Sequence, residues 1–325
     1  MEYGIGIDLG GTKILTGIIN REDGSVIATC KKKTKSNCGE KVNLEEKIQE
    51  SIIEVLNESG IEKGKINSIG IGIAGQVDRE NGILIASPNI DTYNMHIKQI
   101  IEEKIGIPTY IGNDVEIATI GEKRFGSGKE CDDFICIFVG TGVGSCIVKN
   151  NKICYGATGT AGEIGHIIVD QGGRPCGCGS NGCLEAYASR TAIEKRITGA
   201  LKKGRQSIVL EFIKRDGKIT SSVIKKALLH KDDLVLQAIE EGSDYLASGI
   251  ASVINLINPK LIILGGGLIE AVDEFYQRTI KKARMKALKV PSSSILFEKA
   301  SLGDNAGIIG AAFLNEYRVS KVLKT

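Results

Sequence analysis

The stretch that decides the fold is IGIDLGGTKILTGII at residues 5–19, in which two apolar strands flank a glycine turn. The segment ICIFVGTGVGSCIV at residues 135–148 repeats this plan. In both halves a tight turn, Asp23-Gly24 or Asn150-Asn151, leads into a third strand, and helical patterns follow. The repeat therefore predicts two α/β domains that share one βββα arrangement.

Periodicity along the chain predicts the remaining elements. Apolar residues recur at helical spacing from Leu44 to Leu56, and Asn81-Gly82 has the composition of a hairpin turn. Asp114 is of a residue type that caps helices, so a helix is expected to begin there. Further strands are expected at residues 66–74, 109–111 and 261–264, further helices at about residues 95–105, 185–198 and 232–258, and a last helix from about Asp304.

Composition excludes several classes of protein. Of 325 residues 41 are glycine, but they follow no three-residue period and 42% of the residues are hydrophobic, which excludes a collagen or a flexible linker. We expect glycine to serve turns, helix ends and close approach to ligands. Lys and Arg total 42 against 39 Asp and Glu, which gives no electrostatic reason to expect a nucleic-acid or membrane partner.

Targeting signals are not evident in the sequence. The first residues lack the basic and apolar regions of a secretory leader, and no run reaches the ~18 apolar residues of a membrane span. Nine cysteines in such a chain predict free or metal-bound thiols in a reducing cytoplasm.

Three glycine clusters each follow an apolar strand, at residues 8–13, 140–144 and 265–267. One such cluster alone favours a tight turn, although its exposed backbone N–H groups also suit phosphate. Three clusters in two repeated halves favour a nucleotide site. The Walker A and dinucleotide patterns do not fit, because Gly126-Ser127-Gly128-Lys129 is followed by Glu130 and the glycines at 70, 72 and 75 precede a hairpin.

A metal site is indicated by His166, Cys176, Cys178 and Cys183, which form the pattern H-x9-C-x-C-x4-C. Three thiolates and one imidazole make a tetrahedral set typical of a structural zinc. The glycines at 177, 179 and 182 would let the loop wrap around the ion. The alternatives are free cysteines or a disulfide between Cys176 and Cys183.

Three carboxylates lie beside these features: Asp114 after a strand, Glu163 before His166, and Glu185 after Cys183. Single acidic residues are mostly surface charges. Carboxylates also accept the protons of sugar hydroxyls in fixed directions, so their attachment to the metal loop and to a strand end favours a sugar site.

Together these motifs resemble the sugar kinases of the ROK family (repressor, open reading frame, kinase), and among them the bacterial glucokinases. The resemblance extends from Gly4 to about Ala312. AGEIGH with CGCGSNGCLE is its most specific part, whereas the glycine loops alone indicate only the wider actin–hexokinase superfamily. The motifs are DLGGTK at 8–13, GIAGQVD at 72–78, SPN at 87–89, GND at 112–114, GTGVG at 140–144, AGEIGH at 161–166, CGCGSNGCLE at 176–185, NP at 258–259, GGG at 265–267 and GDNAGIIGAA at 303–312.

The resemblance implies two ribonuclease-H-like domains with a cleft for ATP and sugar between them, the smaller at residues 1–123 with 304–325 and the larger at 124–303. It implies Asp114 as the general base that accepts the proton of the attacking hydroxyl, and Asp8 as the residue near Mg²⁺. The other implied sugar contacts are Gly75, Asn89, Asn113, Glu163, His166 and Glu185. The implied ATP contacts are Gly10, Gly11, Thr12, Lys13, Thr141, Gly142, Gly266 and Gly267. A structural Zn²⁺ would be held by His166, Cys176, Cys178 and Cys183.

The activity implied by the resemblance is ATP-dependent conversion of glucose to glucose 6-phosphate by a cytoplasmic homodimer or homotetramer. Kinases for fructose, N-acetylglucosamine or N-acetylmannosamine share the motifs and are alternatives. A sugar-responsive repressor of the same family would carry a helix-turn-helix before the first strand; that strand begins here at Tyr3, so the sequence disfavours it. An actin-like filament protein would not need the Cys₃His loop.

Overall fold

The computed structural model describes residues 2–34, 43–213 and 217–317. The chain divides into two compact units, Met1–Glu130 with Ser301–Thr325, and Cys131–Ala300. The first boundary lies beyond the expected 123/124 because the turn after the helix that ends at Phe125 is bonded back to it, with Gly128 N donating to Glu122 O at 3.0 Å. The second lies at 300/301 rather than 303/304. No helix in the described ranges is long and apolar enough to cross a membrane.

The first unit is built on a five-stranded sheet in the order β3-β2-β1-β4-β8. β1 pairs antiparallel with β2 and parallel with β4, which pairs parallel with β8. A smaller sheet contains β5, β6 and β7, and the predicted hairpin turn joins β5 to β6. The strands are β1 (Tyr3–Leu9), β2 (Lys13–Asn20), β3 (Val26–Lys33), β4 (Ile66–Ile73), β5 (Gln76–Asp78), β6 (Ile83–Ser87), β7 (Thr92–Met95) and β8 (Thr109–Asn113).

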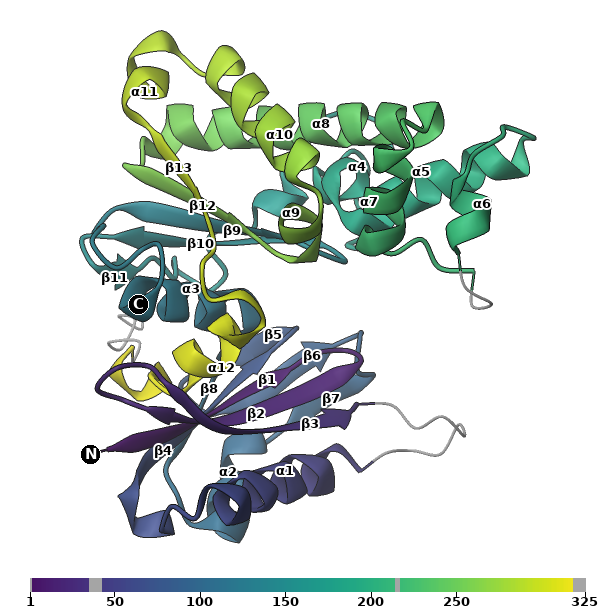
Figure 1. Ribbon diagram of the computed structural model, residues 1–325. Coiled ribbons are helices and arrows are strands. Elements are labelled where there is room, and N and C mark those ends of the chain that lie inside the picture. The colour runs from purple at the N-terminus through teal and green to yellow at the C-terminus, as the bar shows by residue number, and fades with distance from the viewer. Residues whose placement is uncertain (1, 35–42, 214–216, 318–325) are drawn as a thin grey trace. The chain divides into compact units, whose positions relative to one another are not determined.

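Helices α1 (Leu44–Ser59) and α2 (Ile97–Ile105) lie on one face of the five-stranded sheet (Figure 1). Ile48 of α1 and Ile101 of α2 share one buried cluster with the isoleucines of β1 and β4. The sequence sets both ends of α1: the Asn43 side chain accepts a hydrogen bond from Glu46 N, and Gly60 adopts a φ of 66°.

Isoleucine and glycine alternate along β1 and β4, in YGIGIDL and INSIGIGI. Because successive side chains of a strand point to opposite faces, the isoleucines face α1 and α2 and the glycines face away from them. On that second face, a Cβ on Gly6 would lie 1.7 Å from the Ile308 carbonyl oxygen, and one on Gly70 would lie 1.8 Å from that of Ala311. Glycine here lets helix backbone approach strand backbone, a use that we did not expect from the sequence.

The helices on this second face are α3 (Asp114–Phe125) and α12 (Ala306–Ala311), which follows a short 3₁₀ turn at Gly303–Asn305. They pack on each other as closely as on the sheet. A Cβ on Gly310 would lie 1.7 Å from Ile117 O, and a Cβ on Gly121 would lie 2.4 Å from Ala306 O. α12 is therefore held by backbone contacts with two strands and one helix.

A buried carboxylate holds the two places where the chain leaves and re-enters the first unit. Glu122 of α3 has no exposed surface. Its carboxylate accepts hydrogen bonds from the backbone N–H groups of Ser127 at 2.8 Å, and of Ser301 and Leu302, both at 3.0 Å. A carboxylate that accepts three N–H bonds is well compensated for burial.

The second unit repeats the sheet of the first, with the order β11-β10-β9-β12-β13. β9 pairs antiparallel with β10 and parallel with β12, which pairs parallel with β13. The predicted α/β class and internal repeat are thus confirmed. The strands are β9 (Phe134–Val139), β10 (Val143–Lys149), β11 (Lys152–Ile153), β12 (Leu261–Gly265) and β13 (Leu296–Lys299).

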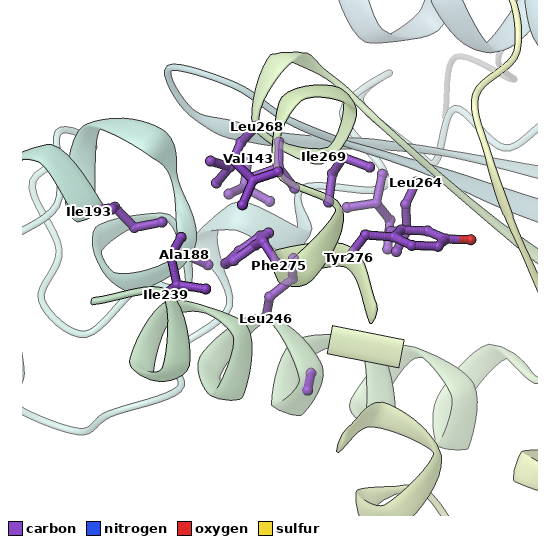
Figure 2. Close-up of a cluster of buried hydrophobic side chains, with 14 of the residues drawn as sticks. Val143, Ala188, Ile193, Ile239, Leu246, Leu264, Leu268, Ile269, Phe275 and Tyr276 are labelled. Carbon is purple, nitrogen blue, oxygen red and sulfur yellow. The ribbon is translucent and has the colours of Figure 1, made fainter. Parts of the chain in front are cut away.

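Helices cover this second sheet over an extended apolar core (Figure 2). Ile239 and Leu246 of the long α8 lie beside Ala188, Ile193 and Phe275, and all of these side chains are buried. The helices are α4 (Glu185–Ala188), α5 (Arg190–Lys202), α6 (Val209–Phe212), α7 (Ser221–Leu229), α8 (Asp233–Ile257), α9 (Gly267–Ala271), α10 (Asp273–Lys286) and α11 (Lys289–Ser294).

Two predicted helix details were wrong. The helix expected at residues 185–198 is two helices, because Ser189 is extended (φ −69°, ψ 157°) and its side chain caps α5 by accepting from Ala192 N. The helix expected to begin at Asp114 does begin there, which confirms that prediction, but its cap is Asn113 and not Asp114. In both cases the side chain of a polar residue, Ser189 or Asn113, accepts a hydrogen bond from a free N–H group in the first turn of the helix.

The packing of α12 predicts opposite effects for two helical glycines. Gly310→Ala should lower the free energy of unfolding by about 3 kcal/mol or more, because its Cβ would overlap the Ile117 carbonyl. Gly199→Ala in α5 is the matched control, since nothing lies within 4 Å of its Cβ. Gly199→Ala should raise the free energy of unfolding by about 0.5–1 kcal/mol, because alanine has the higher helix propensity. Urea unfolding measures both, and a tolerated Gly310→Ala would contradict the close packing.

Candidate functional site

Three parallel strands of the first unit end at the same edge of its sheet. Leu9 at the end of β1 pairs with Ile73 at the end of β4, and Ile73 pairs with Asn113 at the end of β8. In α/β sheets, ligands bind beyond the carboxyl ends of parallel strands. The predicted residues Asp8 and Gly75 therefore lie near this edge together with Asn113.

Asn113 links two of these strand ends. Its Oδ1 accepts from Val115 N at 2.9 Å, which caps α3, and its Nδ2 donates to Gly75 O at 3.3 Å. The structure thus brings Gly75, Asn113 and the start of α3, where Asp114 lies, into one cluster. Sequence reasoning missed Glu116, which completes a capping box with Asn113. The pattern N-x-x-E at residues 113–116 was the available signal.

The first glycine loop follows β1. Gly10 N donates to Lys13 O at 3.0 Å, which closes a tight turn. A Cβ on Gly11 would lie 3.1 Å from the Cβ of Asn89, so these two predicted contacts face each other. Thr12 is exposed, and Lys13 Nζ lies 3.8 Å from a carboxylate oxygen of Asp304. Asp304 was not predicted as a site residue.

Asp8 has an unusual electrostatic environment. Burial, and then the negative charge of Asp114, raise its pKa from 3.8 to about 6, with Asp304 adding to the shift and Lys13 opposing it. The carboxylates of Asp8, Asp114 and Asp304 therefore interact at this edge, and the charge of Lys13 opposes their effect. A divalent cation would relieve this excess of negative charge.

The second glycine loop follows β9 in the second unit. Gly140 N donates to Gly142 O at 2.9 Å, and the third cluster follows β12, whose Gly265 pairs with Phe138 of β9. Gly266 adopts a φ of 89°, and a Cβ there would lie 2.7 Å from Val139 O. Only glycine fits that position. The two clusters, with Thr141, Gly142, Gly266 and Gly267, therefore lie at one edge of the second sheet.

Arg190 is a cation beside the second glycine loop that sequence reasoning missed. Its backbone N donates to Gly140 O at 2.9 Å, and its guanidinium donates to Thr141 Oγ1 at 3.2 Å and to Glu194 at 3.1 Å. A guanidinium beside a glycine-rich loop suits an anionic ligand.

Glu185 connects this loop to the cysteine-rich loop. Its Oε2 accepts from Val143 N at 2.9 Å, and its Oε1 lies 4.0 Å from Cys176 Sγ. One carboxylate oxygen of this predicted sugar contact is therefore occupied by the backbone. Glu163 and His166, the other predicted contacts of this unit, are exposed at a short 3₁₀ turn, Ile164–His166.

The four predicted metal ligands come together. The ligand atoms of His166, Cys176, Cys178 and Cys183 all lie within 4.8 Å of one another. Cys178 Sγ is 3.6 Å from Cys183 Sγ, and Cys176 Sγ is 3.8 Å from His166 Nδ1. A tetrahedron with Zn–S bonds of about 2.3 Å places two sulfurs about 3.8 Å apart, so the donor set and its spacing fit a metal ion of this kind.

The backbone of the cysteine-rich loop supports this arrangement. Gly179 and Gly182 adopt φ values of 93° and 80°, whereas no positive φ is recorded for Gly177, so only two of the three predicted glycines are required. A hydrogen bond from Ser180 N lowers the pKa of Cys178 to about 7, which favours a thiolate ligand. The cysteines of the described residues are free, which leaves no disulfide between Cys176 and Cys183.

Tyr187 holds the cysteine-rich loop to the helical part of the second unit. Its hydroxyl donates to Asp170 at 2.7 Å and accepts from Arg174 N at 2.7 Å. The Arg174 guanidinium then contacts both carboxylate oxygens of Glu241 on α8, at 3.0 Å each. The loop is thus fixed from outside as well as by its own ligands.

Comparison with known proteins places these residues in a family. The model of the ROK family matches residues 4–317. A glucokinase of Thermotoga maritima is 32% identical over 318 residues, which cover 97% of this chain and 98% of that protein. A xylose repressor of Caldicellulosiruptor bescii is 30% identical over 245 residues, which cover 75% of this chain and 61% of that protein.

The fold is also similar to that of a solved enzyme. The crystal structure of a ROK family glucokinase from Streptomyces griseus, in complex with glucose and AMPPNP, matches with a TM-score of 0.83 and 31% identity. The match covers 96% of this chain and 98% of that one.

The ligand cluster predicts that one thiolate is essential for metal content. Cys178→Ser should release the bound metal, because serine is a poor ligand for a soft-ligand tetrahedral site. The metal content of the purified protein, measured by mass spectrometry, checks this expectation. Cys154→Ser is the control, since Cys154 is a free thiol outside the cluster. Equal metal content in both variants would contradict the site.

The raised pKa of Asp8 predicts a pH-dependent gain from removing its charge. Ionising Asp8 costs more in the folded chain than in the unfolded one, so this residue destabilises the protein as the pH rises from 3.8 through about 6. Asp8→Asn should therefore raise the free energy of unfolding by about 1–3 kcal/mol at pH 7.5 without magnesium. This stabilisation should vanish below about pH 4. Urea unfolding across this range measures it. Asp91→Asn, an exposed counterpart, should show no such trend; a pH-independent effect at Asp8 would refute the assignment.

Proposed function

The chain belongs to the ROK family, and from this premise we propose that it is a sugar kinase that transfers the terminal phosphoryl group of ATP to the 6-hydroxyl of a hexose. Glucose is the substrate that we propose first. The observation that carries the proposal is the cluster at the end of β8, where Asp114 starts a capped helix beside Gly75 and near the glycine loop after β1. The glucokinase relatives in two organisms support the choice of sugar.

Asp114 would act as the general base. A sugar hydroxyl is a weak nucleophile, and a carboxylate within hydrogen-bond reach accepts its proton as the new O–P bond forms. Asn113 and Asn89 would fix the sugar through their amides, and Gly75 would let its edge approach the backbone. Glu163, His166 and Glu185 are the sugar contacts that we propose from the second unit.

Phosphate would be handled by backbone and by cations. In the loops at Gly10–Lys13 and Gly140–Gly142, the N–H groups other than those of Gly10 and Gly140, which bond within their turns, would face the phosphate oxygens. Gly266 and Gly267 would lie on the nucleoside side. Phosphoryl transfer relies on positioning and on neutralising charge. Mg²⁺, bound with ATP, supplies part of that neutralisation, and Asp8 is the residue that we expect to hold it, which its crowded negative surroundings support.

We assign zinc to the Cys₃His cluster as a structural ion. All four positions of its tetrahedron would be filled by the protein, which leaves no position for a substrate oxygen. The ion would fix the loop that carries His166 and that lies against Glu185. Its role is thus to keep the sugar contacts in place.

A sugar-responsive transcriptional regulator is the second candidate, because a xylose repressor matches three quarters of this chain at 30% identity. The formal net charge of +3 gives no electrostatic support for DNA binding. A gel-shift assay that showed specific DNA binding, without turnover of any sugar, would favour the regulator.

A sugar panel combined with one variant tests the kinase. ADP release should be fastest with glucose among glucose, fructose, N-acetylglucosamine and N-acetylmannosamine, and phosphorus NMR should place the phosphate on the 6-oxygen. Asp114→Ala should lower kcat by about 10²–10⁴-fold, the usual range for a lost general base, with metal content unchanged. Glu103→Ala, an exposed carboxylate on α2, is the control.

Two outcomes would contradict parts of the proposal separately. Rapid turnover of an N-acetylated sugar with none of glucose would refute the glucokinase assignment while leaving the kinase. Retained turnover in a folded Asp114→Ala protein would remove Asp114 as the base.

A further inference from the structure

A buried ion pair lies behind the start of α3. Glu116 is 3% exposed, and one oxygen of its carboxylate, Oε2, makes three contacts. It accepts from Arg79 Nε at 2.7 Å, lies 2.7 Å from Arg79 Nη2, and accepts from the backbone N–H of Asn113 at 3.1 Å. The Arg79 side chain is also largely buried, at 16% exposed.

Burial makes each charge depend on the other. A carboxylate taken out of water costs several kcal/mol unless it is paired and hydrogen-bonded, and here the guanidinium supplies the charge while Asn113 supplies a further donor. Because all three bonds end on one oxygen, the position of Glu116 fixes the distance from Arg79 to the Asn113 backbone.

The segment that carries Arg79 is joined to Asn113 a second time. Gly75, four residues before Arg79, accepts from the Asn113 side chain at 3.3 Å. Residues 75–79 therefore hold Asn113 by its side chain through Gly75 and by its backbone through Arg79 and Glu116. These contacts form a closed ring around the residue that precedes Asp114.

We propose that Arg79 and Glu116 are positioning residues, which hold Asn113 and Asp114 in the geometry that proton acceptance requires. The proposal rests on the proposed function of Asp114. Neither residue needs to contact the sugar; the pair acts through the Asn113 backbone. Catalysis is sensitive to such support, because a displacement of about 1 Å in a reacting group costs on the order of 10²-fold in rate.

The central test compares Glu116→Ala with Glu116→Gln. The alanine variant removes the acceptor for Asn113 N, so kcat should fall about 10–100-fold and the KM for sugar should rise. The KM for ATP should stay within about twofold, because the Glu116 carboxylate contacts Arg79 and the Asn113 backbone, which lie outside the glycine loops. The glutamine variant keeps an oxygen for Arg79 and Asn113 and should retain kcat within about threefold.

A double variant separates positioning from folding. Glu116→Ala leaves the Arg79 guanidinium buried without this partner, which can impair folding by itself. Arg79→Met with Glu116→Ala removes both charges, and we expect it to recover stability while kcat stays low. If the pair had a structural role alone, the double variant would instead recover kcat together with stability.

The matched control is Glu102→Ala. Glu102 also accepts a backbone hydrogen bond in the first unit, from Thr109 N at 2.8 Å, at the other end of the strand that leads to Asn113. Its loss should lower stability without changing kcat or either KM.

Hydrogen exchange gives a readout that does not depend on activity. In both alanine-bearing variants the Asn113 amide should exchange at least about 10-fold faster than in the wild type, since its acceptor is lost. Unchanged exchange at residues 113–116, or a double variant with wild-type kcat and KM, would overturn the proposal. If the wild type phosphorylates no sugar, the proposed function fails, and the exchange measurement alone decides whether the pair holds Asn113.

Discussion

The contact on which the first unit depends is the approach of the α12 backbone to β1 and β4. It is possible because glycine alternates with isoleucine along both strands, so that one face of the sheet is apolar and the other has no side chains at Gly6 and Gly70. A residue with a Cβ at either position would overlap a carbonyl of α12. The isoleucine side of the sheet should tolerate substitution better than the glycine side, because apolar side chains of similar volume can repack.

The same packing shapes the chemistry at the sheet edge. Asp8 stands on the glycine face of β1, and a Cβ on Gly307 of α12 would lie 3.2 Å from it. α12 and the turn before it thus cover Asp8 and bring Asp304 near, which together with Asp114 raises the pKa of Asp8 to about 6. Asp8 thus becomes a weaker acid than an ordinary aspartate, in part through burial by a helix almost 300 positions away in the sequence.

Sequence patterns predicted what is local and periodic. The strands of the repeat, the amphipathic α1 and the metal ligands follow from spacing within short segments, and the structure brings those ligands together. The break at Ser189 was missed because helical periodicity continues through it. Contacts between distant segments, such as that of Arg190 with Thr141, have no sequence signal before the sheet order is known. The strand glycines were misjudged because their neighbours lie on α12.

The route of the chain also imposes an order on its synthesis. Residues 131–300 form a continuous unit, whereas the first unit lacks α12 and the backbone donors of Ser301 and Leu302 for Glu122 until the second has been made. At about 5–20 residues per second, the ribosome needs roughly 10–40 s to cross that interval. For that time the part of the glycine face that α12 covers is left open beside α3, so the first unit is completed after the second.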